Sequence, residues 1–133
     1  MLTTDLIIIG AGPGGYETAL LAARRGLSVA LIERGEVGGT CLNEGCIPTK
    51  ALCRTAAMVS DFAEAEAFGI KDVAFTLDFP AVMERKRAVV KQLRDGVESL
   101  ISNPNIHLLR GEARFVDALT VEAAGERVTA KDV

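Results

Sequence analysis

The order of apolar and polar positions predicts a strand, a helix and a second strand in the first third of the chain. Residues 5–9 are a short apolar run rich in β-branched side chains, as expected of a strand buried on both faces, and residues 27–32 predict a second apolar strand. Residues 16–25 are rich in alanine and leucine and predict a helix capped by Gly26. This order is typical of an α/β fold.

Two long helical patterns follow. Residues 51–66 continue a helix that starts near Cys46, and residues 79–102 predict a second helix. Between them, residues 71–79 are predicted to form a loop with strand-like pieces. Apolar side chains recur at helical spacing along the second helix and are expected to face the core: Val82, Val89, Val90, Leu93, Val97, Leu100 and Ile101.

In the last quarter of the chain, apolar and polar residues alternate as in short strands. Residues 106–110 predict a third strand, placed beside the second. Residues 113–133 alternate like a small β-meander, with a turn at 124–126. The predicted fold is therefore a Rossmann-like three-layer α/β domain with a small β-meander.

A glycine-rich segment joins the first predicted strand to the first helix. It consists of Gly10, Ala11, Gly12, Pro13, Gly14 and Gly15 and matches G-x-G-x-x-G. Gly10 permits a tight turn, Gly12 a close backbone approach to a pyrophosphate, and Gly15 the packing of the helix on the strand. Glu33 ends the second strand, where a ribose hydroxyl needs an acceptor, and disfavours NADP. These features together predict a dinucleotide site, although the motif does not separate FAD from NAD.

Two cysteines five residues apart, Cys41 and Cys46, follow the second strand, with Gly45 between them. A bridge closing so short a loop contributes only about 2 kcal/mol of chain entropy, so it suits a disulfide that opens and closes better than a structural staple. From the spacing alone, it is equally plausible that the two cysteines are unbridged and serve as small, buried hydrophobic residues. A zinc site is disfavoured because only Cys53 and His107 remain as further ligands, and we expect Cys53 to pack against the core.

Composition narrows the class further. The net charge of −3 gives no electrostatic footprint for nucleic acid, and no apolar run is long enough to span a membrane. The N-terminus lacks the basic region of a signal peptide, so we expect a reducing, cytoplasmic setting. There, a cysteine pair is more often catalytic or metal-binding than structural.

The segment Gly38-Gly-Thr-Cys-Leu-Asn-Glu-Gly-Cys-Ile-Pro-Thr-Lys50, taken with the glycine motif and Glu33, resembles the pyridine nucleotide-disulfide oxidoreductases. Within that family, the sequence of this segment is most similar to the N-terminal, FAD-binding part of the dihydrolipoyl dehydrogenases. The resemblance implies that Cys41 is the thiol that exchanges with substrate and that Cys46 is the charge-transfer thiol against the flavin. It also implies that Lys50 reaches the flavin near its reactive edge.

The same resemblance assigns the rest of the cofactor site. Gly39 and Thr40 would line FAD, Glu33 and its neighbour Arg34 would lie at the adenosine ribose, and the backbone at Ala113 would lie against the adenine. The implied reaction is oxidation of dihydrolipoamide, carried on lipoyl domains of 2-oxo acid dehydrogenase complexes, through the Cys41–Cys46 disulfide and FAD to NAD.

The resemblance also concerns the extent of the chain. Residues 1–133 would be the N-terminal part of the FAD domain, truncated at its C-terminus, with the NAD and dimerisation domains of a full-length homodimer absent. On that basis we expect the 133-residue chain to be inactive by itself. A related disulfide or mercuric reductase, and a non-catalytic flavin-binding module, are the alternatives.

Overall fold

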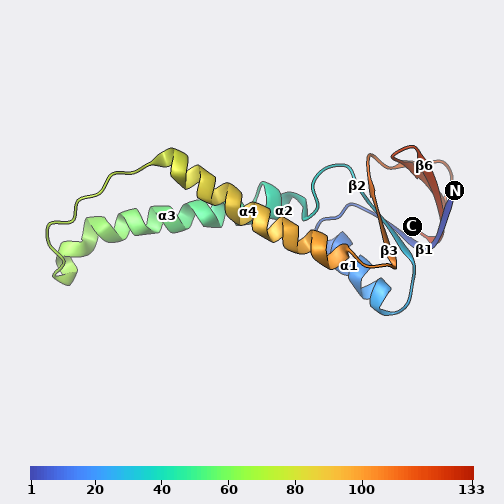
Figure 1. Ribbon diagram of the computed structural model, residues 1–133, viewed down its shortest axis with the longest axis horizontal. Helices are drawn as coiled ribbons and strands as arrows, with labels where there is room; N and C mark the ends of the chain where they lie inside the picture. Colours follow the sequence, from blue (N-terminus) through green and yellow to red (C-terminus); the bar gives the residue numbers. More distant parts are fainter.

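The computed structural model describes residues Met1–Val133, which form one six-stranded sheet and a set of helices (Figure 1). The elements in chain order are β1 (Leu2–Ile9), α1 (Pro13–Arg24), β2 (Val29–Glu33), α2 (Gly39–Asn43), α3 (Cys46–Glu64), the 3₁₀ helix η1 (Ala65–Phe68), α4 (Phe79–Ile101), β3 (Ile106–Arg110), β4 (Arg114–Phe115), β5 (Thr120–Ala123) and β6 (Glu126–Asp132). No helix combines the length and the apolar character that crossing a membrane requires.

The strands are ordered β3-β2-β1-β6-β5-β4. β1 pairs in parallel with two neighbours: its second half lies against β2, and its first half lies against β6. β3 continues the parallel part beyond β2, whereas β4, β5 and β6 pair antiparallel. Parallel pairing places the carboxyl ends of β1, β2 and β3 along one edge, which is where ligands bind in open α/β sheets.

Alternate residues of the parallel strands point into two separate cores. Val29 and Leu31 pack with the inner faces of α1 and α4, while Ala30 and Ile32 pack with Val121 and other residues of the meander. The molecule therefore has three layers, of helices, parallel sheet and meander. The predicted three-layer α/β fold with a small β-meander is confirmed.

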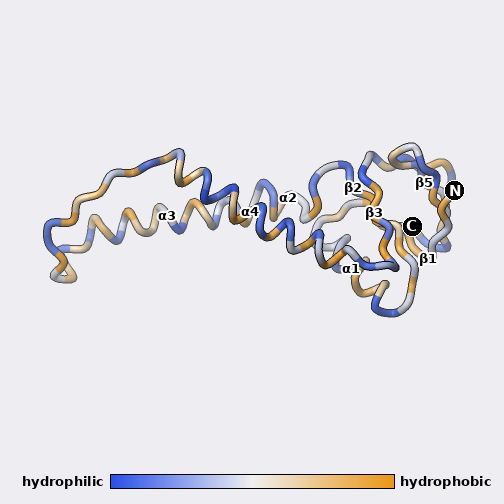
Figure 2. Tube along the Cα trace, in the orientation of Figure 1, coloured by the Kyte–Doolittle hydropathy of each residue, from blue (hydrophilic) through white to orange (hydrophobic).

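The helices α3 and α4 form a long hairpin that extends away from the sheet (Figure 1). Its far end, between the two helices, carries many apolar residues, seen as orange stretches in Figure 2. Phe62 and Phe75 contact each other there, with ring centroids 5.3 Å apart. Phe68 and Ile70 are mostly exposed, at 78% and 58%. We call residues 58–79 the hairpin tip.

Most predicted elements are present, with shifted ends. The first helix begins at Pro13 instead of residue 16, because proline is well tolerated in the first turn and Gly12 takes the N-cap position. Its end at Gly26 is confirmed, with a positive φ of 83°. The turn in the meander is also confirmed, and Ala124 and Gly125 both have positive φ, as a tight hairpin turn requires.

Three expectations about these elements are wrong. Residues 71–78 contain no strand, because no other strand lies within reach at the hairpin tip. Leu93 and Leu100 of the apolar stripe are exposed, at 42% and 53%, because α4 buries only a narrow face. Strand β1 is not buried on both faces throughout, since Ile9 is 47% exposed at the carboxyl edge.

The expectation that Cys53 packs against the core is also wrong, because its side chain is exposed. α3 packs along α4 and meets α2 and η1 only at its ends, and Cys53 is left exposed to solvent.

A cluster of polar side chains links β1 to the chain segments on both sides of it in the sheet. Asp5 accepts hydrogen bonds from the Ser28 backbone N–H and hydroxyl, both at 2.9 Å, and from Lys131 Nζ at 2.6 Å. The bond from Lys131 and then those from Ser28 hold the pKa of the Asp5 carboxyl well below its usual value, because they stabilise the charged form. In return, Asp5 raises the pKa of Lys131. The cluster ties β1 to β6 and to the turn before β2.

Candidate functional site

The turn between β1 and α1 depends on the absence of side chains. Gly10 has φ of +99°, and its N–H donates to Ile32 O at 2.7 Å, which ties the turn to the end of β2. A Cβ placed on Gly15 would lie 1.8 Å from Gly10 O. Residue 15 must therefore be glycine for α1 to start directly above the strand, as the motif predicts.

A second close approach joins this turn to α2. Gly39 has φ of +69°, and a Cβ there would lie 2.8 Å from Gly12 Cα. Gly38 donates its N–H to Ala11 O at 2.8 Å beside this contact. Thus the glycine motif and the start of the cysteine segment form one backbone unit. The first turn of α1 has no side-chain cap and no acidic residue, so its N–H groups and positive dipole end are available to an anion.

Glu33 is fixed by backbone donors on two sides. Its Oε2 accepts the Ala11 N–H at 2.7 Å, and its Oε1 accepts the Gly35 N–H at 2.8 Å. A carboxylate has about four acceptor positions, so both oxygens retain capacity for a further donor in the cleft that Glu33 lines. The carboxylate therefore has a structural partner in the glycine turn as well as a free accepting side.

A cleft of about 750 Å³ opens at the carboxyl ends of β1, β2 and β3. Its walls come from the ends of these strands, from α2 and from one residue of α4: Ile9, Gly10, Ile32, Glu33, Arg34, Gly35, Glu36, Gly39, Thr40, Asn43, Glu44, Arg94, Gly111, Glu112 and Ala113. Gly111 belongs to a tight junction, because a Cβ on it would lie 2.9 Å from Ala124 N. The cleft thus follows the sheet edge on which an extended dinucleotide would lie.

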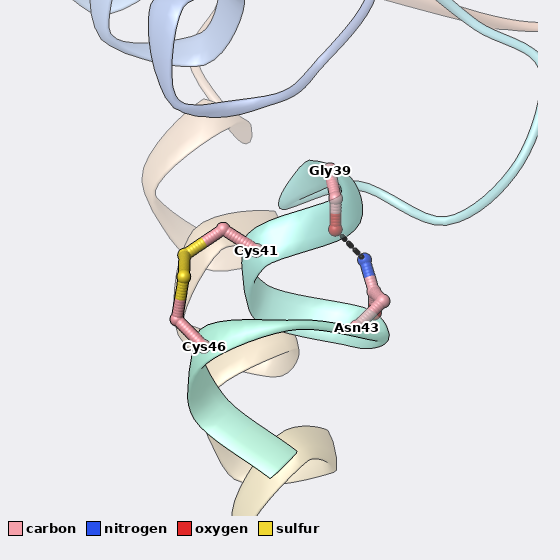
Figure 3. Close-up of a disulfide and its surroundings, with 4 residues drawn as sticks. All are labelled: Gly39, Cys41, Asn43 and Cys46. Atoms are coloured by element: carbon pink, nitrogen blue, oxygen red, sulfur yellow. Dashed lines mark hydrogen bonds between the residues drawn. A yellow bond between two sulfur atoms is a disulfide. The ribbon is translucent and has the colours of Figure 1, made fainter. Parts of the chain in front are cut away.

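Cys41 and Cys46 form a disulfide with their Cα atoms 4.8 Å apart (Figure 3). Cys41 is in α2 and half-buried, whereas Cys46 is the first residue of α3 and exposed. Gly45 makes the junction possible, since a Cβ on it would lie 3.3 Å from Cys41 Cα. The first turn of α3 has no side-chain cap and no acidic residue, so the N-terminal end of the helix favours a thiolate at Cys46.

Asn43 connects α2 to the loop before it and to α4. Its Nδ2 donates to Val37 O at 2.9 Å and to Gly39 O at 3.0 Å, and its Oδ1 accepts from Arg94 Nε at 2.8 Å. Figure 3 shows Asn43 bonded to Gly39 on the side of α2 away from the disulfide. Arg94 also lies 3.7 Å from Glu36 Oε1.

The structure brings about half of the sequence-predicted site residues into the cleft. Those that line it are Gly10, Glu33, Arg34, Gly39, Thr40 and Ala113. Gly12, Pro13, Gly14 and Gly15 form the turn and the first helical residues above it, and Cys41, Cys46 and Lys50 lie on α2 and α3 outside the cleft lining. Lys50 is exposed one turn after Cys46.

Sequence reasoning missed Asn43, Arg94 and the Gly111 junction. Asn43 lies inside the cysteine segment, so its position there was an available signal. No local sequence signal pointed to Arg94, because it lies 51 positions after Asn43 and the two residues meet only in the folded hairpin.

Comparison with known proteins agrees with this geometry. The family model described as pyridine nucleotide-disulphide oxidoreductase matches residues 4–133. Dihydrolipoyl dehydrogenase from Chlamydia muridarum (strain MoPn / Nigg) is 46% identical over 122 residues, which are 92% of this chain and 26% of that protein. Dihydrolipoyl dehydrogenase from Geobacillus stearothermophilus is 45% identical over 120 residues, which are 90% of this chain and 26% of that protein.

A solved structure shares the fold. The Cu(II) complex of the HOCl-induced flavoprotein disulfide reductase RclA from Escherichia coli superposes with a TM-score of 0.77 at 31% identity, covering 98% of this chain and 27% of that one. Fold and site together define a dinucleotide-binding α/β domain with a disulfide beside the glycine motif. The chain belongs to the pyridine nucleotide-disulphide oxidoreductase family, and it spans about a quarter of the length of the curated relatives it matches.

Proposed function

We propose that this chain is the FAD-binding portion of an FAD-dependent dihydrolipoyl dehydrogenase. The proposal rests on the family match and on the relatives of that name at 40–46% identity. The whole protein would be a cytoplasmic homodimer that oxidises dihydrolipoamide on lipoyl domains of 2-oxo acid dehydrogenase complexes and reduces NAD.

One observation carries this proposal: a disulfide stands at the start of α3, on the same backbone unit as the glycine motif. Gly39 touches Gly12, and Cys41 follows Gly39 by two residues in the same short helix. A disulfide in that position would lie within reach of a cofactor bound by the motif. A purely structural bridge would need no such neighbour, and the loop it closes is too short to stabilise the fold strongly.

The residues that line the cleft fit an adenine dinucleotide. The uncapped first turn of α1 would hold the pyrophosphate, with Gly12, Pro13, Gly14 and Gly15 providing close backbone approach. Glu33 would accept from the ribose hydroxyls through the free sides of its carboxylate, beside Arg34.

The remaining contacts follow along the cleft. Ala113 would contact the adenine with its backbone at the far end of the cleft, and Gly39 and Thr40 would line the part of the cofactor nearest α2. Lys50, one turn beyond Cys46, would reach the reactive edge of the flavin.

The cysteines would perform the exchange with substrate. A dihydrolipoamide thiolate attacks the Cys41 sulfur, the bridge breaks, and Cys46 leaves as a thiolate stabilised by the N-terminal end of α3. The second substrate thiol attacks the mixed disulfide and releases oxidised lipoamide, so two electrons and two protons reach the cysteine pair. FAD, when bound, supplies the acceptor that takes these two electrons on to NAD and restores the disulfide.

An absorption spectrum of the purified chain with added FAD tests the proposal. We expect a bound-flavin spectrum that gains a long-wavelength charge-transfer band when thiol partially reduces the protein. Absence of any FAD binding to the folded chain would contradict the cofactor assignment.

The variant Cys46→Ser separates a redox site from a mere binding module. In the proposed site, the serine variant binds FAD and lacks the long-wavelength band, because the thiolate is gone. A spectrum identical to that of the wild type under the same reduction would mean that Cys46 has no contact with the flavin.

A further inference from the structure

The short helix α2 depends on contacts outside itself. It has five residues, too few for an isolated helix to be stable in water, and its N-cap residue Gly38 has φ of +101° and offers no side-chain cap. It nevertheless carries both Gly39, which touches the glycine motif, and Cys41. Whatever holds α2 in place therefore holds Cys41 relative to Cys46.

Asn43 supplies that restraint from inside α2. Its amide nitrogen bonds to the carbonyl oxygens of Val37 and Gly39, the residues just before and at the start of the helix. These bonds close the turn on itself, and they fix which way the amide faces, leaving Oδ1 to point toward α4. In this orientation Oδ1 accepts its hydrogen bond from another element.

Arg94 is that donor. Its Nε lies 2.8 Å from Asn43 Oδ1, and its Nη1 lies 3.7 Å from Glu36 Oε1. The Arg94 side chain is 27% exposed, so it is shielded from water over most of its surface. Val90 and Val97, one turn before and after, are buried in the helical core, which makes α4 a firm base for the arginine.

We propose that Arg94, acting through Asn43, is a positioning residue for the Cys41–Cys46 pair. It holds α2 so that the two thiols stay close enough to form the bond again after the bridge is reduced. The significance of this restraint rests on the proposed function, in which the pair opens and closes in every cycle.

The test measures the equilibrium between the chain and dithiothreitol, without FAD. One dithiothreitol is oxidised to its cyclic disulfide as the Cys41–Cys46 bond becomes two thiols, so the equilibrium constant reports how well the protein holds the two thiols together. Loss of the Arg94 bond is expected to favour the reduced form about fivefold in Arg94→Met, the order expected for one charge-assisted hydrogen bond that remains partly open to water.

A double-mutant cycle shows whether the arginine acts through the asparagine. Asn43→Ala is expected to favour the reduced form at least as much as Arg94→Met, and the double variant to match Asn43→Ala alone. Effects that add in full in the double variant would overturn the proposal. Should Arg94→Met fail to fold, Arg94→Leu, whose side chain has no donor for Oδ1, tests the same loss of the hydrogen bond.

Arg87→Met is the matched control, because Arg87 is an exposed arginine of α4 with no hydrogen bond or ion pair. Its equilibrium constant is expected to stay at the wild-type value. Circular dichroism melting of each variant separates positioning from folding. If Arg94→Met lowers Tm and leaves the thiol–disulfide equilibrium unchanged, the arginine is merely structural and the proposal is overturned.

The two proposals fail in different ways. An unchanged equilibrium in Arg94→Met, with normal FAD binding by the wild type, overturns the positioning role and leaves the proposed function standing. A wild-type chain that binds no FAD contradicts the proposed function, whereas a shifted equilibrium in the variants still supports the positioning of the pair.

Discussion

At the scale of single residues, Gly15 has the least room for any change. An added Cβ would lie 1.8 Å from the carbonyl oxygen of Gly10, so Gly15→Ala must displace either α1 or the turn. We expect this substitution to cost about 3 kcal/mol or more in the free energy of unfolding, the upper part of the range for overpacking. Urea denaturation of both proteins, followed by circular dichroism, measures the difference.

Gly14→Ala is the control for that substitution. A Cβ on Gly14 meets no atom within 4 Å, and alanine is the better helix former in the first turn of α1. Its free energy of unfolding should stay the same or rise by less than about 1 kcal/mol. Equal losses in the two variants would contradict the steric explanation.

Glu33 is expected to matter before any cofactor binds. In Glu33→Gln one of the two backbone N–H groups, of Ala11 or of Gly35, must face an NH₂ group and loses its acceptor. We expect a loss of about 1–2 kcal/mol in the free energy of unfolding, and weaker FAD binding in a titration followed by fluorescence. An unchanged stability would mean that these bonds are readily replaced by water.

The residue scale also shows what a sequence can foretell. The conformational roles of Gly10 and Gly15 follow from local motif chemistry, and in the structure the Glu33 carboxylate accepts a hydrogen bond from the same turn. Arg94 was unpredictable, because its partner Asn43 meets it only when the α3–α4 hairpin has formed. The expected burial of Cys53 failed because sequence spacing cannot tell how many neighbours a helix has.

At the scale of elements, the cluster of Asp5, Ser28 and Lys131 makes the sheet sensitive to acid. The folded-state pKa of Asp5 is depressed, so its contribution to stability is complete above the unfolded pKa of about 4 and is lost as the pH falls below it. We expect the free energy of unfolding to fall as the pH drops from about 5 to about 2. The fall should be smaller in Asp5→Asn, which cannot be protonated at this position. Denaturant titrations across that range measure it.

Asp61→Asn is the comparison for this experiment, because Asp61 is exposed on α3 and makes no hydrogen bond. It should reproduce the acid dependence of the wild type. A parallel loss of acid dependence in both variants would mean that general charge, and not the cluster between β1 and β6, controls the effect.

Element boundaries were predictable where a local signal existed. Gly26 and the 124–126 turn mark ends that the structure confirms, whereas the first helix starts at Pro13, three residues before the predicted residue 16. The predicted strand-like pieces at 71–79 failed because a strand needs a partner, and residue alternation cannot say whether one is near. The parallel register of β1 with both β2 and β6 likewise depends on contacts across the whole chain.

At the scale of the whole molecule, the hairpin tip gathers several exposed apolar side chains, a feature that favours association. Phe68 and Ile70 are the clearest examples, at 78% and 58% exposed. We expect the chain to self-associate reversibly as its concentration rises, and the double substitution Phe68→Ser, Ile70→Ser to weaken this by about tenfold. Sedimentation equilibrium over a concentration series measures the association.

Phe115→Ser controls for a general effect of surface apolar residues, since Phe115 is 62% exposed on the opposite side of the molecule, in the meander. Association that weakens equally in this variant would contradict a specific role of the hairpin tip. A wild-type chain that stays monomeric at every concentration would remove the basis for the prediction.

The disulfide also lies at the base of the long hairpin of α3 and α4. Cys46 is the first residue of the 19-residue helix α3, which extends about 28 Å at the usual rise per residue. In a rigid arm of this length, a rotation of about 5° at the bridge corresponds to a displacement of about 2.5 Å at the distal end of α3. The same rotation applies at both ends, so a small change of angle at the bridge and a contact made at the hairpin tip are geometrically linked.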